Sequence, residues 1–247
     1  MYTTLMVKVI VHHLGLGDQI MLNGMIRHFA EDDIVYTFCK TCHMESVEFM
    51  YKDNKNIRLI PVDNTNPQEI WSKVPKGDDV QIIPLATYGM DDRSWSIFTK
   101  MTNWAHGVYL QAKVNPLYMY TKFRVDRDQS IELPPPIDGD YIFIHDDPER
   151  DRNIQVNTEL YVYKPHAKVI DERKEFFKCD HPNIFAYIGL IEKAKEVHCM
   201  NSSYNWMIEL MKIGDKSKNF FHVNVAHLYY TPDIVKTVFS DDMWTFQ

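Results

Sequence analysis

The sequence predicts an α/β protein with two parallel-sheet domains, and three observations support that prediction. Short apolar runs alternate with segments of helical period along both halves of the chain. The run Pro134-Pro135-Pro136, followed closely by Asp138-Gly139, separates the halves as a linker does. The 247 residues, 45% of them hydrophobic, provide enough material for two small cores. We therefore expect domains at 1–128 and 129–247.

The first half begins with the apolar, β-branched run Leu5–Val11, which is typical of a parallel strand covered on both faces. A helix is expected over Ile20–Ala30, where apolar residues recur every three or four positions. Strands and helices then alternate: strands Ile34–Phe38, Ile57–Val62 and Val80–Pro84, and helices at His43–Tyr51 and around Trp71. This β-α-β-α-β order predicts a doubly wound parallel sheet.

An aromatic-rich segment, 88–122, interrupts this alternation and is expected to form one or two helices. The second half restarts with a strand at Tyr141–Ile144. Its remaining expected elements are strands at Lys168–Ile170 and Glu196–Met200 and helices at Ile184–Ala194, Ser203–Met211 and Pro232–Phe239. The prediction leaves open whether the last helix packs on its own domain or back on the first.

Charge and hydropathy exclude several classes of function. The net charge of -7 argues against a nucleic-acid partner, because binding phosphates needs a basic patch. The sequence contains no run of about 18 apolar residues, the length that a transmembrane helix needs. The N-terminal residues fit a first strand better than a signal peptide, so we expect a cytoplasmic protein.

Two short patterns suggest metals or cofactors, and neither is favoured. Cys39 and Cys42, followed by His43, match a haem-attachment site, half a zinc site or a redox dithiol, but structural thiols are the preferred interpretation. Asp126 and Asp128 spell the Asp-x-Asp pattern of metal-binding transferases, yet an arginine separates them and no strand precedes them. We expect no metal and no cofactor.

The strongest functional signal is the turn Gly15-Leu16-Gly17-Asp18, which links the first strand to the first helix. Glycines there let a ligand approach backbone amides at the carboxyl edge of the sheet. Ile20 stands where a dinucleotide fingerprint needs its third glycine, and a P-loop lysine is missing. We predict ligand contacts at Gly15, Gly17 and Gln19; the alternative is a tight turn in which Asp18 caps the helix.

Two further groups of polar residues follow strands of the second half. His145, Arg150 and Arg152 come directly after its first strand, where arginine forks suit a diphosphate. Asn201, Ser202 and Ser203 precede a helix, and hydroxyls and amides at a helix N-terminus also suit a phosphate. The alternatives are a solvated mixed-charge loop for the first group and simple helix capping for the second.

The turn and the segment Asn23–Phe29 after it resemble the first loop and helix of GT-B glycosyltransferases of the heptosyltransferase type, including small glycosyltransferase-like proteins of viruses and microbes. Fucosyltransferases are a more distant likeness. The resemblance implies two Rossmann-like domains facing a cleft, with Asp18 as the general base. Glu196–Trp206 is similar to the family's donor-site element, in which Thr-Ser-x-x-His joins a strand to a helix. Here Asn201-Ser202 stands in place of Thr-Ser, and Asn205 stands in place of the histidine.

The resulting hypothesis is a glycosyltransferase that moves a sugar of unspecified type from a nucleotide-sugar donor to a glycan or other hydroxyl acceptor. The expected reaction is inverting and independent of metal, with Asp18 deprotonating the acceptor. The donor would lie mainly on the second domain, near Arg150, Arg152 and Ser202, and the acceptor mainly on the first. Two alternatives are kept: an inactive GT-B-like binding or scaffold protein, and an S-adenosylmethionine-dependent methyltransferase.

Overall fold

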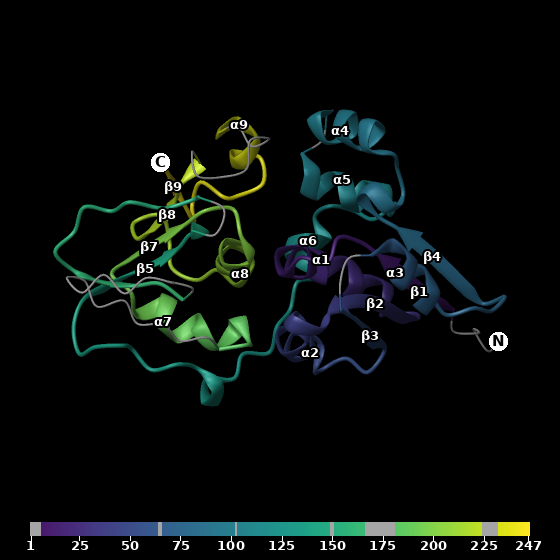
Figure 1. Cartoon of the computed structure of the whole chain (residues 1–247), viewed down its shortest axis with the longest axis horizontal. Helices are drawn as coiled ribbons and strands as arrows, with labels where there is room; N and C mark the ends of the chain where they lie inside the picture. Colours follow the sequence, from purple (N-terminus) through teal and green to yellow (C-terminus); the bar gives the residue numbers. More distant parts are fainter. Residues whose placement is uncertain (1–5, 64–65, 102, 149–150, 166–180, 224–231) are drawn as a thin grey trace. The chain divides into compact units, whose positions relative to one another are not determined.

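The computed structural model describes residues 6–63, 66–101, 103–148, 151–165, 181–223 and 232–247. The chain divides into two compact units, Met1–Asp126 and Arg127–Gln247, whereas the sequence-based boundary lies at 128/129. Each unit contains its own parallel sheet with helices packed around it (Figure 1). The predicted α/β class with two parallel sheets is confirmed.

The first unit contains a four-stranded parallel sheet in the order β3-β2-β1-β4. Its strands are β1 (Val7–Val11), β2 (Ile34–Lys40), β3 (Ile57–Val62) and β4 (Val80–Pro84). The helices are α1 (Leu16–Phe29), α2 (Met44–Tyr51), α3 (Pro67–Lys73), α4 (Asp92–Met101), α5 (Trp104–Gln111) and α6 (Tyr118–Thr121). Short 3-10 turns lie at Thr41–His43 and Ala86–Tyr88. The aromatic-rich segment thus forms three helices, where one or two were expected.

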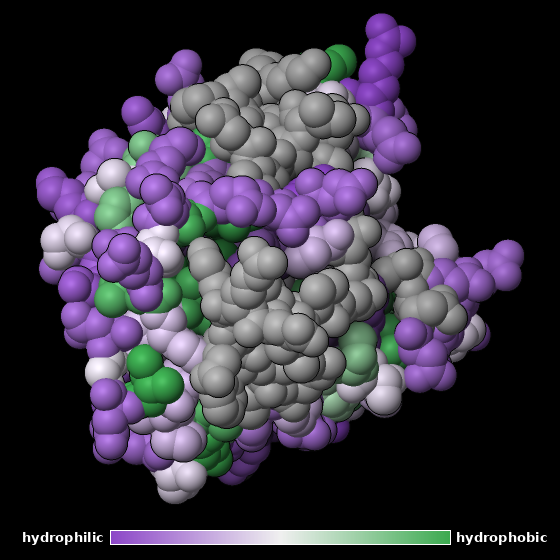
Figure 2. Space-filling view, turned by 60° about the vertical axis from the view of Figure 1, so that its left-hand side comes forward, coloured by the Kyte–Doolittle hydropathy of each residue, from purple (hydrophilic) through white to green (hydrophobic). Residues whose placement is uncertain are grey.

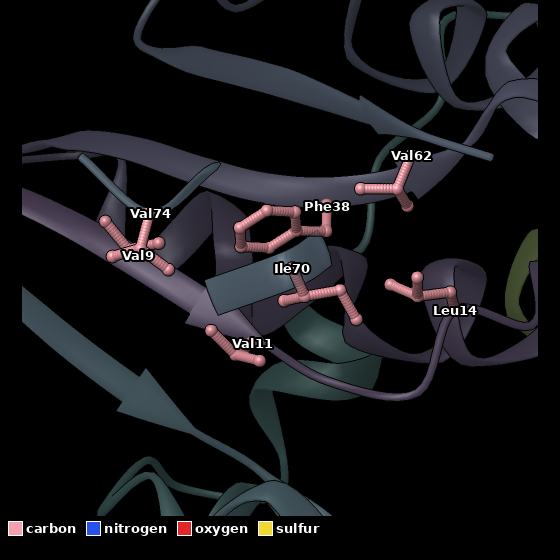
Figure 3. Close-up of a cluster of buried hydrophobic side chains, with 7 residues drawn as sticks. All are labelled: Val9, Val11, Leu14, Phe38, Val62, Ile70 and Val74. Carbon is pink, nitrogen blue, oxygen red and sulfur yellow. The ribbon is translucent and has the colours of Figure 1, made fainter. Parts of the chain in front are cut away.

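Apolar side chains from three strands and one helix form a core on one face of this sheet (Figure 3). Val9 and Val11 of β1, Phe38 of β2 and Val62 of β3 meet Ile70 and Val74 from the α3 region. Leu14 joins them just after β1, so burial of this side chain anchors the start of the glycine turn. The core therefore fixes the position of the segment that leads into α1.

The residues after the glycine turn hold α1 in place. Gly24 lies against α6, where an added Cβ would come within 1.9 Å of the Tyr118 carbonyl oxygen. Arg27 donates to both carboxylate oxygens of Asp53, at 3.0 and 2.7 Å. Asn23 is fully buried and exchanges two hydrogen bonds with the backbone of Arg124. These contacts give the Asn23–Phe29 segment a structural role.

The second unit contains a five-stranded parallel sheet in the order β6-β5-β7-β8-β9. Its strands are β5 (Tyr141–His145), β6 (Tyr161–Tyr163), β7 (Glu196–Cys199), β8 (Asn219–Phe221) and β9 (Thr245–Phe246). Its helices are α7 (Ile188–Lys193), α8 (Ser203–Met211) and α9 (Pro232–Lys236), with 3-10 turns at Gln129–Ile131 and Ile184–Tyr187. The strand expected at 168–170 lies outside the described residues.

The C-terminal segment packs on the second unit itself. The Phe239 ring lies 4.6 Å from that of Trp206 and 5.2 Å from that of Phe221. Glu209 of α8, which is 1% exposed, accepts from the Trp244 indole at 2.9 Å. A helix was expected over Pro232–Phe239, but α9 ends at Lys236.

Hydrophilic and hydrophobic residues are interspersed on the face of the molecule in Figure 2. Within the described ranges, no helix is both long and apolar enough to cross a membrane.

Candidate functional site

Each sheet has one point at which its strand order reverses direction, and the predicted site residues lie beside these two points. In the first sheet the chain runs outward from β1 through β2 to β3 and then returns to β4 on the other side of β1. In the second sheet, β6 and β7 flank β5 in the same way. Open α/β sheets bind ligands at the carboxyl ends of the strands at such switch points. Each unit therefore contains a candidate site of its own.

The glycine turn follows β1 at the first switch point. Gly15 is the N-cap of α1, with φ -65° and ψ 145°, and Asp18 is the third residue of the helix. The Asp18 carboxylate accepts from the Gly15 amide and from its own amide. This is the backward half of a capping box, so the alternative that placed Asp18 at the N-cap is wrong. An added Cβ on Gly15 would lie only 2.7 Å from Asp18 Oδ2, so a larger residue there would displace the carboxylate from its present position.

Asp18 has an unusual protonation equilibrium. Burial raises the pKa of its carboxyl from 3.8 to about 7, against the opposing effects of the two amides and of the positive charge on Lys40. Desolvation disfavours the charged form of an acid, and here that effect dominates. A carboxyl that titrates near neutral pH can both take up and release a proton under physiological conditions. Such a shift at the edge of a sheet is a physical marker of a functional group.

A pocket of about 650 Å³ opens at the same switch point, between the segments that follow β1 and β4. Its lining includes Gly15, His13, Trp71, Thr87, Tyr88 and Asp92, all of them in the first unit. The volume lies within the range of small-molecule sites, which is roughly 300–1,000 Å³. Gly15 thus belongs to both the pocket wall and the Asp18 contact.

The pocket wall after β4 is held in a strained conformation. Ala86 has φ 51°, the left-handed region that residues with a Cβ rarely adopt. The Gln111 side chain makes two hydrogen bonds with this residue, a clamp in which it accepts from the Ala86 amide at 2.6 Å and donates to the Ala86 carbonyl at 3.3 Å. Strained residues persist only where surrounding contacts hold them in place, and they are common at functional sites. The clamp directs the next two residues, Thr87 and Tyr88, into the pocket wall.

A histidine joins the two sides of the pocket. His13 Nε2 lies 2.9 Å from Thr87 Oγ1, and the His13 ring meets the Tyr88 ring edge-on at 6.1 Å. Burial lowers the pKa of His13 below its usual 6.5, with a smaller opposing effect from Asp92. The imidazole is therefore mostly neutral at pH 7. The sequence analysis did not identify His13, Trp71 or Thr87 as site residues.

The other two predicted residues of the turn lie within α1. Gly17 is in its first turn, where helix amides have no intrahelical acceptor. Gln19 is fully buried, and its side-chain amide donates to the Phe38 carbonyl at 2.6 Å. That contact ties α1 to β2, so the Gln19 side chain acts inside the fold, and a ligand contact there remains a prediction.

At the second switch point, His145 and Asp146 are held by neighbouring residues. The His145 ring lies 4.2 Å from that of Tyr204 in α8, and the residue is 9% exposed. Asp146 accepts from the Ile154 amide at 3.0 Å and from Lys164 at 2.7 Å. These contacts fix His145 and Asp146 and concern neither Glu149 nor Arg150, which lie outside the described residues.

Arg152 pairs with Asp147 through two backbone hydrogen bonds of 2.9 and 3.0 Å. Across the described part of the chain its guanidinium makes no ion pair, although the residue is half-buried. A half-buried cation at the carboxyl edge of a sheet suits an anionic ligand. Arg150 lies outside the described residues.

The segment after β7 begins α8. Ser202 is the N-cap, and its amide donates to the Asn205 side-chain oxygen at 2.6 Å. Asn205 stands where the family that the sequence resembles has a histidine; it is fully buried, and its side-chain oxygen accepts this bond. Asn201, Ser202 and Ser203 are each partly exposed beside the end of β7. The Ser202 hydroxyl oxygen is buried at the start of α8, where the residue acts as a helix cap, so ligand contacts at these three residues remain predictions.

A chain of titratable side chains, which sequence reasoning missed, runs along the second sheet. His198 Nε2 lies 3.1 Å from Glu196 Oε2, and His198 Nδ1 lies 2.9 Å from His222 Nε2. The His198 ring also stacks on Phe220 at 4.8 Å. Burial, followed by the neighbouring His198, lowers the pKa of His222 to about 4. Glu196 and His198 lie two apart on β7 and so share a face, whereas His222 follows β8 and its proximity to His198 leaves no pattern in the sequence.

The patterns that suggested metals have other partners. Asp126 pairs with Arg124 at 2.9 Å, and Asp128 caps the 3-10 turn through the Ser130 amide. Cys39 is buried whereas Cys42 is exposed, and both are free thiols. Within the described ranges, no group of three or more His, Cys, Asp or Glu side chains is arranged to hold a metal ion.

The fold resembles those of solved glycosyltransferases. TibC from enterotoxigenic E. coli H10407, a dodecameric iron-containing glycosyltransferase, matches with a TM-score of 0.59 and 13% identity over 92% of this chain. TibC in complex with ADP-D-beta-D-heptose, described as a heptosyltransferase, matches with 0.57 and 12% over 87%. A family 9 glycosyl transferase from Veillonella parvula matches with 0.50 and 9% over 98% of this chain and 85% of its own.

The chain spans 63% and 57% of the two TibC chains. Its sequence matches no protein-family model and no curated protein. At these identities the similarity establishes the fold, an α/β architecture with two parallel sheets like that of GT-B glycosyltransferases.

Proposed function

We propose that this chain is a glycosyltransferase that moves a sugar from a nucleotide-sugar donor to a hydroxyl acceptor, with inversion and without a metal ion. Structural neighbours with the same architecture are glycosyltransferases, and one of them binds ADP-D-beta-D-heptose. Fold alone does not determine function, so the proposal depends on the sites. Two switch-point sites in two separate sheets suit a reaction with two substrates.

The observation that carries the proposal is the position of Asp18. Its carboxylate lies against Gly15, and Gly15 lines the 650 Å³ pocket at the first switch point. We assign the acceptor to this pocket and the role of general base to Asp18. Displacement at the anomeric carbon needs a base within hydrogen-bond reach of the acceptor hydroxyl, with a pKa near the working pH. The raised pKa of about 7 meets the second requirement.

We assign the donor to the second unit. The predicted phosphate contacts lie at the N-terminus of α8, around Ser202 and the partly exposed Ser203, since such a terminus attracts phosphate groups. Arg152 would neutralise charge that builds on the diphosphate leaving group, the part that a metal plays in other transferases. Arg150 and His145 remain predicted donor contacts of the same loop.

The proposal predicts how transfer depends on pH. Only the deprotonated form of Asp18 accepts a proton, and that form increases as pH rises through about 7. The rate of transfer should therefore rise with pH through this range and then level off.

The test begins with thermal shift of the full chain against nucleoside diphosphates, nucleotide sugars and S-adenosylmethionine, since a ligand of the folded state raises stability. We expect a nucleotide sugar to bind and, with an acceptor panel, to release its nucleoside diphosphate. The D18N variant should bind the donor normally and lose transfer, whereas D91N, which alters a surface cap, should keep both. Binding without turnover by the wild-type chain would indicate a scaffold, and a response to S-adenosylmethionine alone would indicate a methyltransferase.

A further inference from the structure

The pocket of the first unit has features that identify the chemistry of what it binds. Trp71 of α3 is 41% exposed, one of few large apolar side chains among the described residues that are open to solvent, and it lines this pocket. Tyr88 lines it as well and packs against the apolar core, which fixes its ring. An exposed indole that is not needed for core packing provides a flat apolar surface for a ligand.

The polar groups of the pocket offer both donors and acceptors of hydrogen bonds. Asp92 contributes a carboxylate that can accept from two neighbouring hydroxyl groups. Thr87 provides a hydroxyl, and its contact with His13 at 2.9 Å holds the two groups on the same wall. Asp91, the preceding residue, is occupied as a cap, accepting from Ser94 at 2.9 and 2.7 Å. Of this acidic pair, therefore, Asp92 is the one that lines the pocket.

The charge of the pocket also limits its ligand. Among the described residues that line it, Asp92 has the only formal charge at pH 7, and no lysine or arginine is included. The one histidine, His13, has a lowered pKa and is mostly neutral. A phosphate or carboxylate placed here would face Asp92 without a compensating cation, at a cost in free energy.

We propose that the acceptor bound in this pocket is an uncharged sugar ring, with its apolar face against Trp71 and neighbouring hydroxyls donating to Asp92. A pyranose has one face of C–H groups and a rim of hydroxyls, which matches an aromatic wall beside a carboxylate and a hydroxyl. A lipid would offer no hydrogen-bond donor to the Asp92 carboxylate, and an anionic acceptor would be repelled by it. The role of this sugar as the acceptor rests on the proposed function, whereas its binding to the pocket can be measured separately.

The experiment uses the full chain and ligand-observed saturation-transfer NMR, with tryptophan fluorescence as a second readout. The probes are methyl glycosides of glucose, galactose and mannose, and two anionic counterparts, glucuronic acid and glucose 6-phosphate. We expect at least one neutral glycoside to bind, and the anionic forms of the same ring to bind more weakly by about fivefold or more.

Variants separate the proposed contacts from general effects on the fold. W71A should weaken binding of the neutral glycoside by about fivefold or more, and W71F, which keeps an aromatic face, should weaken it less. D92N should weaken binding of the neutral glycoside and reduce the difference in affinity between the neutral and the anionic probes. W95F is the matched control, because Trp95 of α4 contacts Phe98 at 6.1 Å and is not part of the pocket lining. Far-UV circular dichroism establishes that each variant is folded.

Three results would overturn the inference: no neutral glycoside binds, an anionic counterpart binds more tightly, or W71A binds as the wild type does. Failure of the proposed function looks different. If D18N leaves turnover unchanged while Trp71-dependent sugar binding persists, the base assignment falls and the sugar pocket stands. If D18N abolishes transfer but Trp71 has no effect on sugar binding, the transferase stands and the sugar pocket falls.

Discussion

Replacing Asp18 by asparagine should stabilise the fold at pH 8, and this effect can be worked out from the structure. The side chain keeps its shape and can still accept from the Gly15 amide, but it no longer carries a charge that burial disfavours. The carboxyl pKa is about 7 in the folded chain against 3.8 as its ordinary value, so the folded state binds more protons between these pH values. Wild-type stability from this group therefore falls as pH rises from about 4 to 7.

A pKa change of this size corresponds to at most about 4 kcal/mol, at 1.36 kcal/mol per unit. Asp18 keeps part of its surface exposed, and screening by solvent reduces the figure. We expect D18N to be more stable than the wild type by about 1–3 kcal/mol at pH 8, and by close to nothing at pH 4.

Urea unfolding of both proteins at pH 4, 6 and 8 measures this difference. D91N is the control, because Asp91 also lies at a helix start but its pKa is lowered by hydrogen bonds from Ser94. Its replacement should therefore destabilise the protein at pH 8, the opposite sign. A D18N difference that does not change with pH, or that favours the wild type at pH 8, would refute the assigned environment of Asp18.

Three further substitutions test other parts of the structure. G24A should destabilise the first unit by about 1–3 kcal/mol or more in urea unfolding, because the new methyl group would meet the Tyr118 carbonyl oxygen at 1.9 Å; a neutral result would contradict this packing. A86G should stabilise the fold by about 1 kcal/mol by relieving the strained φ of 51°, and a loss of stability in the same assay would contradict that strain. The wild type should lose stability as pH falls from 6.5 to about 4, because His222 stays neutral in the folded state beside His198 but takes up a proton in the unfolded state. H222Q should lose less stability over this range in urea unfolding, and an unchanged dependence on pH would contradict the lowered pKa.

Much of the fold could be predicted from hydrophobic patterns. Strands Ile57–Val62 and Val80–Pro84 and helix Ser203–Met211 have the predicted bounds, because each is a short apolar or amphipathic run between clear breakers. The strands Tyr161–Tyr163, Asn219–Phe221 and Thr245–Phe246 were missed. They are two or three residues long and gain their stability from neighbours in the sheet, which no local pattern reveals.

The start of α1 was predicted four residues late because glycine lowers helix propensity, and two glycines flank Leu16. Tertiary contacts override that preference here. Leu14 is anchored in the core and Asp18 accepts from the Gly15 amide, so the helix begins immediately after Gly15. Helix propensity takes no account of either contact, so it could not predict this start.

Of the candidate site, the sequence identified the turn but not the pocket beside it. Gly15 and Asp18 follow one strand directly, whereas Thr87 and Trp71 reach the same place from β4 and α3. Their proximity depends on strand order, in which β4 lies next to β1, and on the clamp of Gln111 on Ala86. Neither feature leaves a motif in the sequence. The His198–His222 pair escaped for the same reason, since its members are 24 positions apart.

The central claim is that Asp18 is the base of a sugar transfer, and the most direct measurement compares transfer by wild type and D18N at pH 8. Donor affinity and nucleoside diphosphate release are measured together, with the nucleotide sugar that the thermal-shift panel identifies. We expect donor affinity to change by less than about twofold and transfer to fall by about 100-fold or more. Transfer by D18N at a rate close to that of the wild type, with the donor bound equally well, would contradict the claim.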